Sequence, residues 1–175
     1  MILIPGHIIA KFTFPGVVVH EFAHMLFCKV RKVAIIDVCY FRDGDPVGYV
    51  QHEGSTSFFT TFLISMGPFF VNSLLCLLIC MPAYIPLKFF EIENIYFYFL
   101  LWLGISIGMH AIPSNQDATN VYNEAKIHAR KGNLLAIISF PIVGLIYIFN
   151  LLRVLWADVF YGVGVGLGIP SLIFG

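Results

Sequence analysis

Long apolar runs without charged residues dominate the pattern of the chain. Four stretches contain no Asp, Glu, Lys or Arg: residues 54–87, 95–116, 133–152 and 159–175. A helix needs about 20 apolar residues to cross the hydrocarbon core of a bilayer. The first run is long for one span, and we expect Pro82 and Pro86 to trim its end. The pattern predicts three spanning helices, over about Phe58 to Met81, Ile95 to Ile112 and Leu134 to Trp156.

Both ends of the chain are apolar as well. Pro15 suits the first position of a helix, where its missing N–H costs nothing, and we expect that helix to run to about Val30. At 1.5 Å per residue its length is about 24 Å, so it either falls short of a full span or continues backward across a kink. The glycine-rich tail from Val159 is either a fifth, short membrane segment or a segment that packs on the others.

The pattern changes to β-forming residues between Val33 and Gln51. These residues lie on both sides of Asp43-Gly44, and an Asp-Gly pair between two apolar runs is a hairpin signal. We therefore predict a small β-hairpin over about 33–51. It would lie at the membrane face or in a protein-lined cavity, because unpaired strand edges are costly in lipid.

The composition agrees with a membrane protein. Hydrophobic residues make up 59% of the 175 residues and charged residues only 11%, against about 25% charged in a typical soluble domain. We expect a single α-helical, multi-pass integral membrane domain over 1–175, with four or five transmembrane helices surrounded by the lipid bilayer. The net charge is zero, so nothing indicates a nucleic-acid partner, and no feature indicates an oligomeric state.

Basic residues mark one side of the predicted membrane domain. Cytoplasmic loops carry an excess of Lys and Arg. The segments after the first helix and after the third predicted element are basic, which places the hairpin and a polar helix over about 117–131 on the cytoplasmic side. The basic residues are Lys29, Arg31, Lys32, Arg42, Lys126, Arg130 and Lys131. His24 and Asp117 would then lie toward the same, cytoplasmic face.

The first helix contains the sequence His20-Glu21-Phe22-Ala23-His24. Positions i and i+4 share one face of a helix, so His20 and His24 can bind one metal ion. This is the HExxH pattern, in which Zn²⁺ activates a water and the glutamate accepts its proton. An acidic residue within an apolar membrane helix costs about 2.5–3.5 kcal/mol, and a metal site supplies the partner it needs. We therefore predict one zinc ion per chain, with Glu21 as the general base.

A catalytic zinc site has three protein ligands and an open position for water. Three residues are candidates for the third ligand. Asp117, at the end of the third span, is the first, although it could instead form a capping box with Ser114. Glu53, just after the hairpin, is the alternative ligand, or else a solvated charge. His110 is a buried residue that could instead support Asp117 or the substrate.

Three motifs resemble those of the site-2 protease family of intramembrane zinc metalloproteases. The HEFAH helix is followed by a β-rich stretch. Gly67-Pro68-Phe-Phe-Val-Asn72 is similar to the family's Gly-Pro-x-x-Asn element, and Ile112-Pro113-Ser-Asn-Gln-Asp117 is similar to its Asn-x-x-Pro…Asp-Gly motif. The resemblance covers roughly residues 15–120. One extra residue before Asn72, and His110 and Ala118 in place of an asparagine and a glycine, indicate a divergent member.

The resemblance implies a function. Such enzymes cut a transmembrane or membrane-proximal segment of a protein substrate, to release a regulator or mature a peptide. It also implies that Asp117 is the third zinc ligand, that Asn72 and His110 bind substrate or support the ligands, and that the hairpin holds the substrate as an added strand. The last point meets a physical need, because a helix must unwind before its amides can be attacked.

Two other functions remain open on the sequence alone. One is a non-proteolytic membrane protein that keeps zinc for structure or metal handling, although a structural site needs no base such as Glu21. The other is a membrane-embedded protease of the gluzincin kind, which would use Glu53 as its third ligand and cleave exposed peptides.

Overall fold

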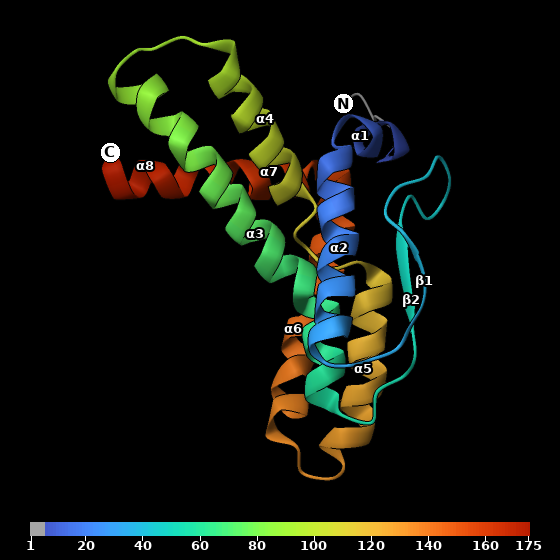
Figure 1. Cartoon of the computed structure of the whole chain (residues 1–175). Helices are drawn as coiled ribbons and strands as arrows, with labels where there is room; N and C mark the ends of the chain where they lie inside the picture. Colours follow the sequence, from blue (N-terminus) through green and yellow to red (C-terminus); the bar gives the residue numbers. More distant parts are fainter. Residues whose placement is uncertain (1–5) are drawn as a thin grey trace.

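The computed structural model describes residues 6–175, which are mostly helical with one small sheet (Figure 1). In chain order the elements are α1 (Gly6–Phe12), α2 (Phe14–Val30), β1 (Ile35–Cys39), β2 (Tyr49–His52), α3 (Phe58–Phe89), α4 (Ile95–Met109), α5 (Asn115–Ala129), α6 (Leu134–Leu152), a 3-10 turn (Arg153–Leu155), α7 (Ala157–Val163), a π-helical segment (Gly164–Gly168) and α8 (Ile169–Phe174).

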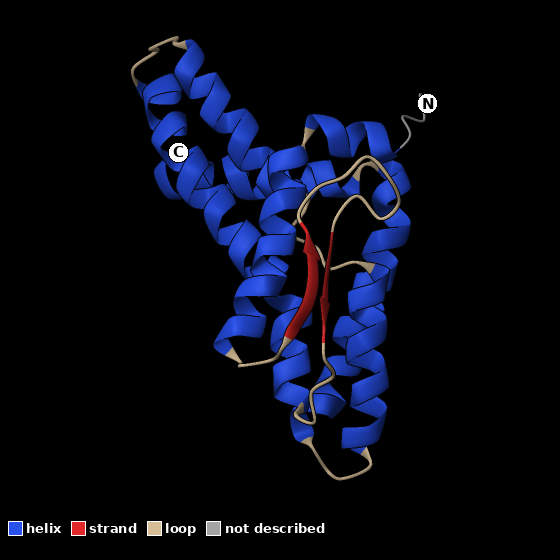
Figure 2. Cartoon of the chain, turned by 45° about the vertical axis from the view of Figure 1, so that its right-hand side comes forward, coloured by secondary structure: helices blue, strands red, loops and turns tan. Residues whose placement is uncertain are grey.

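The helices form two connected groups (Figure 1). In the lower part of the view, the beginning of α3 packs against α2 and α5, and α5 packs against α6. In the upper left, the end of α3 packs with α4 and with the helices of the C-terminal tail. The hairpin β1–β2 lies along α2, outside the bundle (Figure 2). The long helix α3 thus joins the group that carries the hairpin to the more apolar group.

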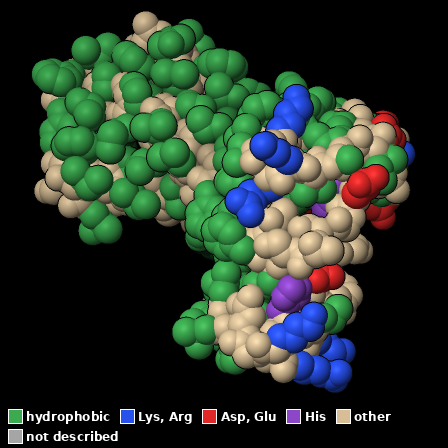
Figure 3. All heavy atoms as spheres, turned by 60° about the horizontal axis from the view of Figure 1, so that its bottom comes forward, with side chains coloured by type: hydrophobic (Ala, Val, Ile, Leu, Met, Phe, Trp, Pro, Cys, Tyr) green, Lys and Arg blue, Asp and Glu red, His purple; other side chains and the backbone are tan. Residues whose placement is uncertain are grey.

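Three helical segments are long and apolar enough to cross a membrane. They are Phe58–Phe89, Leu134–Leu155 and Ala157–Phe174, and α4 is apolar but shorter. Figure 3 shows that hydrophobic side chains cover the lobe on the left, where α3 and α8 end and α4 begins, whereas charged side chains gather on the other side of the same face. This distribution is compatible with a membrane protein.

The predicted hairpin is present, but its turn differs from the expected one. β1 pairs antiparallel with β2, whereas Asp43-Gly44 lies within a broad loop over residues 40–48 rather than in a tight turn. The loop is tied down by an ion pair between Lys11 Nζ and Asp43 Oδ2 at 2.8 Å and by a hydrogen bond from the Arg42 N–H to the Val47 carbonyl at 2.7 Å. The ion pair joins the loop to α1, and the hydrogen bond joins its two arms, so the chain reverses over a broad loop instead of a tight turn at Asp43-Gly44.

The helix α3 does not end where its prolines suggested. It continues through Pro82 and Pro86 to Phe89. A proline removes one backbone donor and crowds the carbonyl four residues before it, but it does not prevent the following residues from keeping helical dihedrals. The expected end at about Met81 was therefore wrong.

The described residues near the two apolar ends of the chain, from Gly6 onward and from Ala157 to Phe174, are helical. Thr13 separates α1 from α2, so the first helix does continue backward across a break. The tail forms a helical segment over Ala157–Phe174 that is long enough to span and also packs closely on α3, because a Cβ at Gly166 would lie 2.8 Å from Cys80 Sγ.

The helix α5 is amphipathic and lies along α6. It begins at Asn115 and ends at Ala129, and Gly132, with φ at +79°, completes the turn into α6. Its apolar face joins the main core of the bundle; the buried members of that core are Phe58, Met66, Ile112, Ala118, Val121, Ala125, Ala136, Val143 and Ile146. The charged residues of this segment indicated a polar helix, whereas its apolar residues Ala118, Val121 and Ala125 pack into the core.

Candidate metal centre

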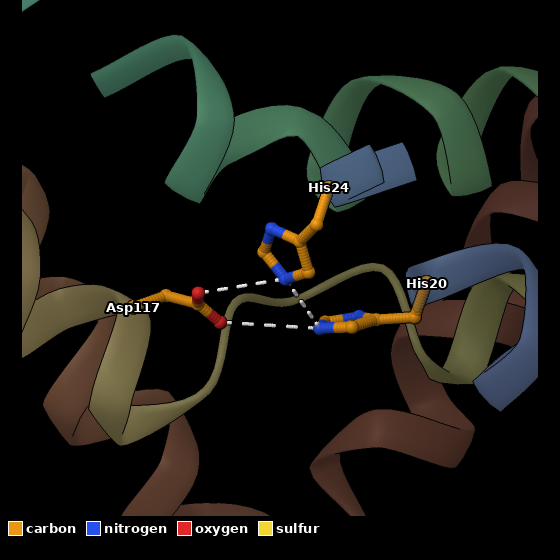
Figure 4. A group of neighbouring side chains, drawn as sticks. All are labelled: His20, His24 and Asp117. Atoms are coloured by element: carbon orange, nitrogen blue, oxygen red, sulfur yellow. Dashed lines mark hydrogen bonds and ion pairs between the residues drawn. The ribbon is translucent and has the colours of Figure 1, made fainter. Parts of the chain in front are cut away.

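The side chains of His20, His24 and Asp117 meet between α2 and the start of α5 (Figure 4). Their potential ligand atoms all lie within 4.8 Å of one another. His24 Nε2 is 3.4 Å from Asp117 Oδ1, and His20 Nε2 is 3.9 Å from Asp117 Oδ2. The structure thus brings together the two histidines of the HExxH segment and the carboxylate that the sequence analysis placed on the same face.

Backbone carbonyls fix both imidazole rings. His20 Nδ1 lies 2.7 Å from the carbonyl oxygen of His110, and His24 Nδ1 lies 2.8 Å from that of Ile64. A carbonyl oxygen can only accept, so each Nδ1 carries the proton and donates it. Hydrogen bonds of this kind orient histidines that bind metals through the other nitrogen.

The remaining ring nitrogens face each other. His20 Nε2 and His24 Nε2 are 3.2 Å apart, and in neutral rings that donate through Nδ1 both Nε2 atoms are acceptors. Two acceptors at this distance repel unless a cation or a proton lies between or beside them. The arrangement therefore suits a positively charged ligand that both nitrogens and the Asp117 carboxylate can share.

Asp117 both caps α5 and faces the histidines. Its Oδ2 accepts hydrogen bonds from the Ser114 backbone N–H at 2.8 Å and from Ser114 Oγ at 2.6 Å, and Ser114 Oγ accepts from the Asp117 N–H at 3.2 Å. This is the capping box that the sequence analysis considered as an alternative role. It leaves Oδ1 directed at His24, so capping and metal binding are compatible.

The environment of Asp117 favours its ionised form. Burial by itself raises the pKa of this carboxyl, but when no metal is bound the charge that His24 gains on protonation, with the hydrogen bond that its Nε2–H then donates, the charge of protonated His20 and the hydrogen bonds from Ser114 hold the pKa well below its ordinary value. The carboxylate is therefore charged at neutral pH and ready to bind a cation.

Asn72 and His110 do not face the ligands directly but hold the backbone that contacts His20. The Asn72 side chain is fully buried, and its Nδ2 lies 3.1–3.3 Å from the carbonyls of Gly16, Ile107 and His110. The His110 carbonyl is the one that holds His20. His110 Nε2 lies 2.8 Å from Thr13 Oγ1, whose hydroxyl donates to a carbonyl, so this ring nitrogen is a donor and is not free to bind a metal.

A cavity of about 430 Å³ opens beside the three residues. His20, Glu21, His24 and Asp117 line it, together with the hairpin loop. The loop approaches Glu21 closely at Gly48, where a Cβ would lie 2.8 Å from Glu21 Cγ. A carboxylate thus borders the same space as the metal-ligand candidates.

Glu53, the alternative ligand, lies elsewhere. The residue is exposed, its backbone N–H donates to the Ala34 carbonyl at 3.0 Å, and its side chain belongs neither to the cavity lining nor to the His-Asp group. The geometry therefore favours Asp117 over Glu53 as the third ligand.

Two residues of the cavity were not identified from the sequence. Gly48 lies against Glu21, and Arg153 forms part of the wall. Arg153 is the only charged residue in the span over Leu134–Leu155. A single charged residue in an apolar span was the sequence feature that could have identified Arg153, because ionisable residues within membrane segments often mark functional sites.

No protein-family model matches this chain, and no curated protein or solved structure matches it either. The function is therefore argued from the geometry of the site.

Proposed function

We propose that this protein is an integral membrane zinc endopeptidase. His20, His24 and Asp117 are its metal ligands, and Glu21 is its general base. The observation that carries the proposal is the state of the two imidazoles: each donates through Nδ1 to a backbone carbonyl, and the two Nε2 atoms converge on a charged carboxylate. A proton on one ring or a shared metal cation relieves the repulsion between the two Nε2 atoms; a metal cation is supported by the third ligand, Asp117, and by the adjacent cavity that Glu21 lines.

The residues present fit zinc. Two imidazole nitrogens and one carboxylate oxygen are the common ligand types of catalytic zinc sites. Within residues 6–175, the group gathers these three and no fourth His, Cys, Asp or Glu. A three-residue set leaves a position for water, which favours a catalytic site over a closed structural one and so disfavours the non-proteolytic alternative. Bound zinc would supply an activated water and polarise the substrate carbonyl.

The protein's own residues hold and move the protons. Glu21 accepts a proton from the attacking water and delivers it to the leaving amine nitrogen. The carbonyls of His110 and Ile64 keep both Nδ1 atoms protonated, so that Nε2 stays available. Ser114 donates to Oδ2 of Asp117, which adds to the stabilisation of the carboxylate and leaves Oδ1 facing His24.

The substrate class follows from the surroundings of the site. Two helices near the ligands, α3 and α6, are long and apolar enough to cross a bilayer, and the basic segments that follow α2 and α5 would then face the cytoplasm. The hairpin has only two strands, so each has an outer edge to which an extended peptide can add by backbone hydrogen bonds. We infer a transmembrane or membrane-proximal protein segment as substrate.

Zinc analysis of the purified full-length chain tests the ligands. We expect one zinc per chain in the wild type and in Glu53→Ala, which serves as a control for the loss of a nearby carboxylate. Asp117→Ala should lose most of its zinc, because a ligand is removed. Full zinc binding by Asp117→Ala, or loss by Glu53→Ala alone, would contradict the assignment.

Cleavage tests the base. Wild type and Glu21→Gln would be co-expressed with candidate membrane substrates, and zinc content measured on the same preparations. We expect Glu21→Gln to keep zinc and to lose cleavage, because the amide cannot accept a proton. Cleavage that survives the substitution would refute the role of Glu21.

A further inference from the structure

The cavity beside the metal ligands has a cationic wall. Among the described residues that line it, Arg153 is the only arginine or lysine. It begins the 3-10 turn that follows α6, on the opposite end of that helix from the basic residues near Gly132. The sequence reading assigned no role to this residue, and the proposed mechanism does not use it.

The simplest role for a lone arginine at the end of a membrane helix is to reach the water interface. Part of the Arg153 side chain is exposed, which agrees with this role. Its charged end nevertheless reaches the site: Nη2 donates to the Ile112 carbonyl at 3.1 Å, and the positive charge interacts electrostatically with Asp158 and also with Asp117 and His20. The guanidinium is therefore held next to the candidate metal centre.

Most N–H groups of the guanidinium are free to donate to a ligand. A guanidinium carries five N–H donors, and within residues 6–175 the bond to the Ile112 carbonyl is the one hydrogen bond that this side chain makes. None of the ion pairs within 4.0 Å in the described part of the chain includes Arg153. Asp158 and Asp117 attract the charge from a greater distance, but the unused N–H donors make no hydrogen bond to a carboxylate and suit an anionic oxygen inside the cavity.

We propose that Arg153 binds the carbonyl oxygen of the scissile peptide and stabilises the negative charge that this oxygen gains during hydrolysis. This inference rests on the proposed function. Arg153 and Glu21 belong to different walls, since Glu21 lies against the hairpin loop at Gly48 and Arg153 is fixed to Ile112 before α5. The base and the anion-binding group can therefore approach one peptide bond from different sides.

The reaction balances without any further reagent. The oxygen of one water bonds to the carbonyl carbon, and one of its protons passes to Glu21. The carbon–nitrogen bond then breaks, and that proton passes to the leaving nitrogen, which gives a carboxylic acid and an amine. The acid then transfers its remaining proton to the amine, so the final products are a carboxylate and an ammonium ion. Arg153 keeps its protons throughout and contributes only charge and hydrogen bonds, which are most valuable where charge develops.

A neighbouring residue provides a matched control. Asn150 Nδ2 donates to the Pro113 carbonyl at 3.0 Å, one residue from the carbonyl that Arg153 holds. Asn150→Ala therefore removes a similar support of the same turn without changing the charge of the cavity. A role of Arg153 that is only structural would be shared by Asn150.

The test uses the full-length chain in detergent, with cobalt in place of zinc so that ligand binding changes the visible spectrum. Acetate serves as an anionic oxygen ligand and imidazole as a neutral one. We expect Arg153→Gln to weaken acetate binding about tenfold to a hundredfold, the range of a charge-assisted hydrogen bond, with imidazole binding unchanged. Arg153→Lys should recover part of the acetate affinity, and Asn150→Ala should leave both affinities within about twofold of the wild type.

Three results would overturn the inference. If Arg153→Gln binds cobalt and its acetate affinity is unchanged, Arg153 does not bind the anionic oxygen, and the proposed function is unaffected. An equal loss of acetate and imidazole binding, or the same loss in Asn150→Ala, assigns Arg153 to holding the turn. Failure of the wild type to bind cobalt overturns the proposed function and this inference together.

Discussion

Replacing Ser114 by alanine separates the two roles of Asp117. The side chain of Ser114 donates to Asp117 Oδ2 at 2.6 Å and accepts from the Asp117 N–H at 3.2 Å. Its loss leaves the start of α5 without a cap and one carboxylate oxygen with a single remaining donor. We therefore expect Ser114→Ala to lower both the stability of the protein and its affinity for zinc.

The two effects have different magnitudes. Removal of a helix cap costs about 0.5–2 kcal/mol of stability. Loss of a hydrogen bond that orients a metal ligand lowers metal affinity about tenfold to a hundredfold. Asn133→Ala is a matched control, because Asn133 caps α6 by accepting from the Ala136 N–H at 3.1 Å and has no contact with the ligands. It should lose stability to a similar extent and keep its zinc affinity.

The assay combines thermal unfolding in detergent with zinc competition against a chelating dye. The reasoning predicts a parallel loss of stability in the two variants and a loss of zinc affinity in Ser114→Ala alone. If both variants kept wild-type zinc affinity, the capping box would have no role in positioning Asp117. If both lost it equally, the effect would come from general destabilisation.

Three further outcomes follow from the geometry. Gly48→Ala should reduce cleavage while zinc stays bound, because its Cβ would meet Glu21 Cγ at 2.8 Å. Gly54 faces open space, so Gly54→Ala should cleave as the wild type does. Equal cleavage by the two variants would refute the effect of the contact on Glu21. Asn72→Ala should lower the unfolding free energy by about 1–3 kcal/mol, because buried carbonyls lose a donor, and should weaken zinc binding through His20; wild-type zinc affinity in a destabilised variant would limit Asn72 to packing. Removing zinc with a chelator should lower the melting temperature, with recovery on adding zinc back, since a ligand that binds only the folded state stabilises it; an unchanged melting temperature would argue against a bound metal.

The elements of this fold were largely readable from the sequence. Charge-free runs predicted the long helices, and β-forming residues around Asp43-Gly44 predicted the hairpin. The end of α3 was misplaced because Pro82 and Pro86 bend or weaken a helix without stopping it. The broad loop was missed because the contacts that hold it, such as Lys11 with Asp43, join residues far apart in the chain.

The site was readable only in part. The spacing of His20, Glu21 and His24 is a local helical pattern, and Asp117 could be placed by the order of the spans. The hydrogen-bond partners of the two imidazoles could not be predicted, because they are the backbone carbonyls of His110 and Ile64, and a backbone carbonyl has no sequence signature. These carbonyls nevertheless decide which ring nitrogen is free.

Zinc X-ray absorption on the purified full-length protein tests the metal centre most directly. The account predicts a bound zinc with nitrogen and oxygen ligands only, at about 2.0–2.2 Å, including scattering from two imidazole rings. The imidazole scattering should be reduced in His24→Ala. A sulfur ligand at about 2.3 Å, or a wild-type protein without zinc, would contradict the account.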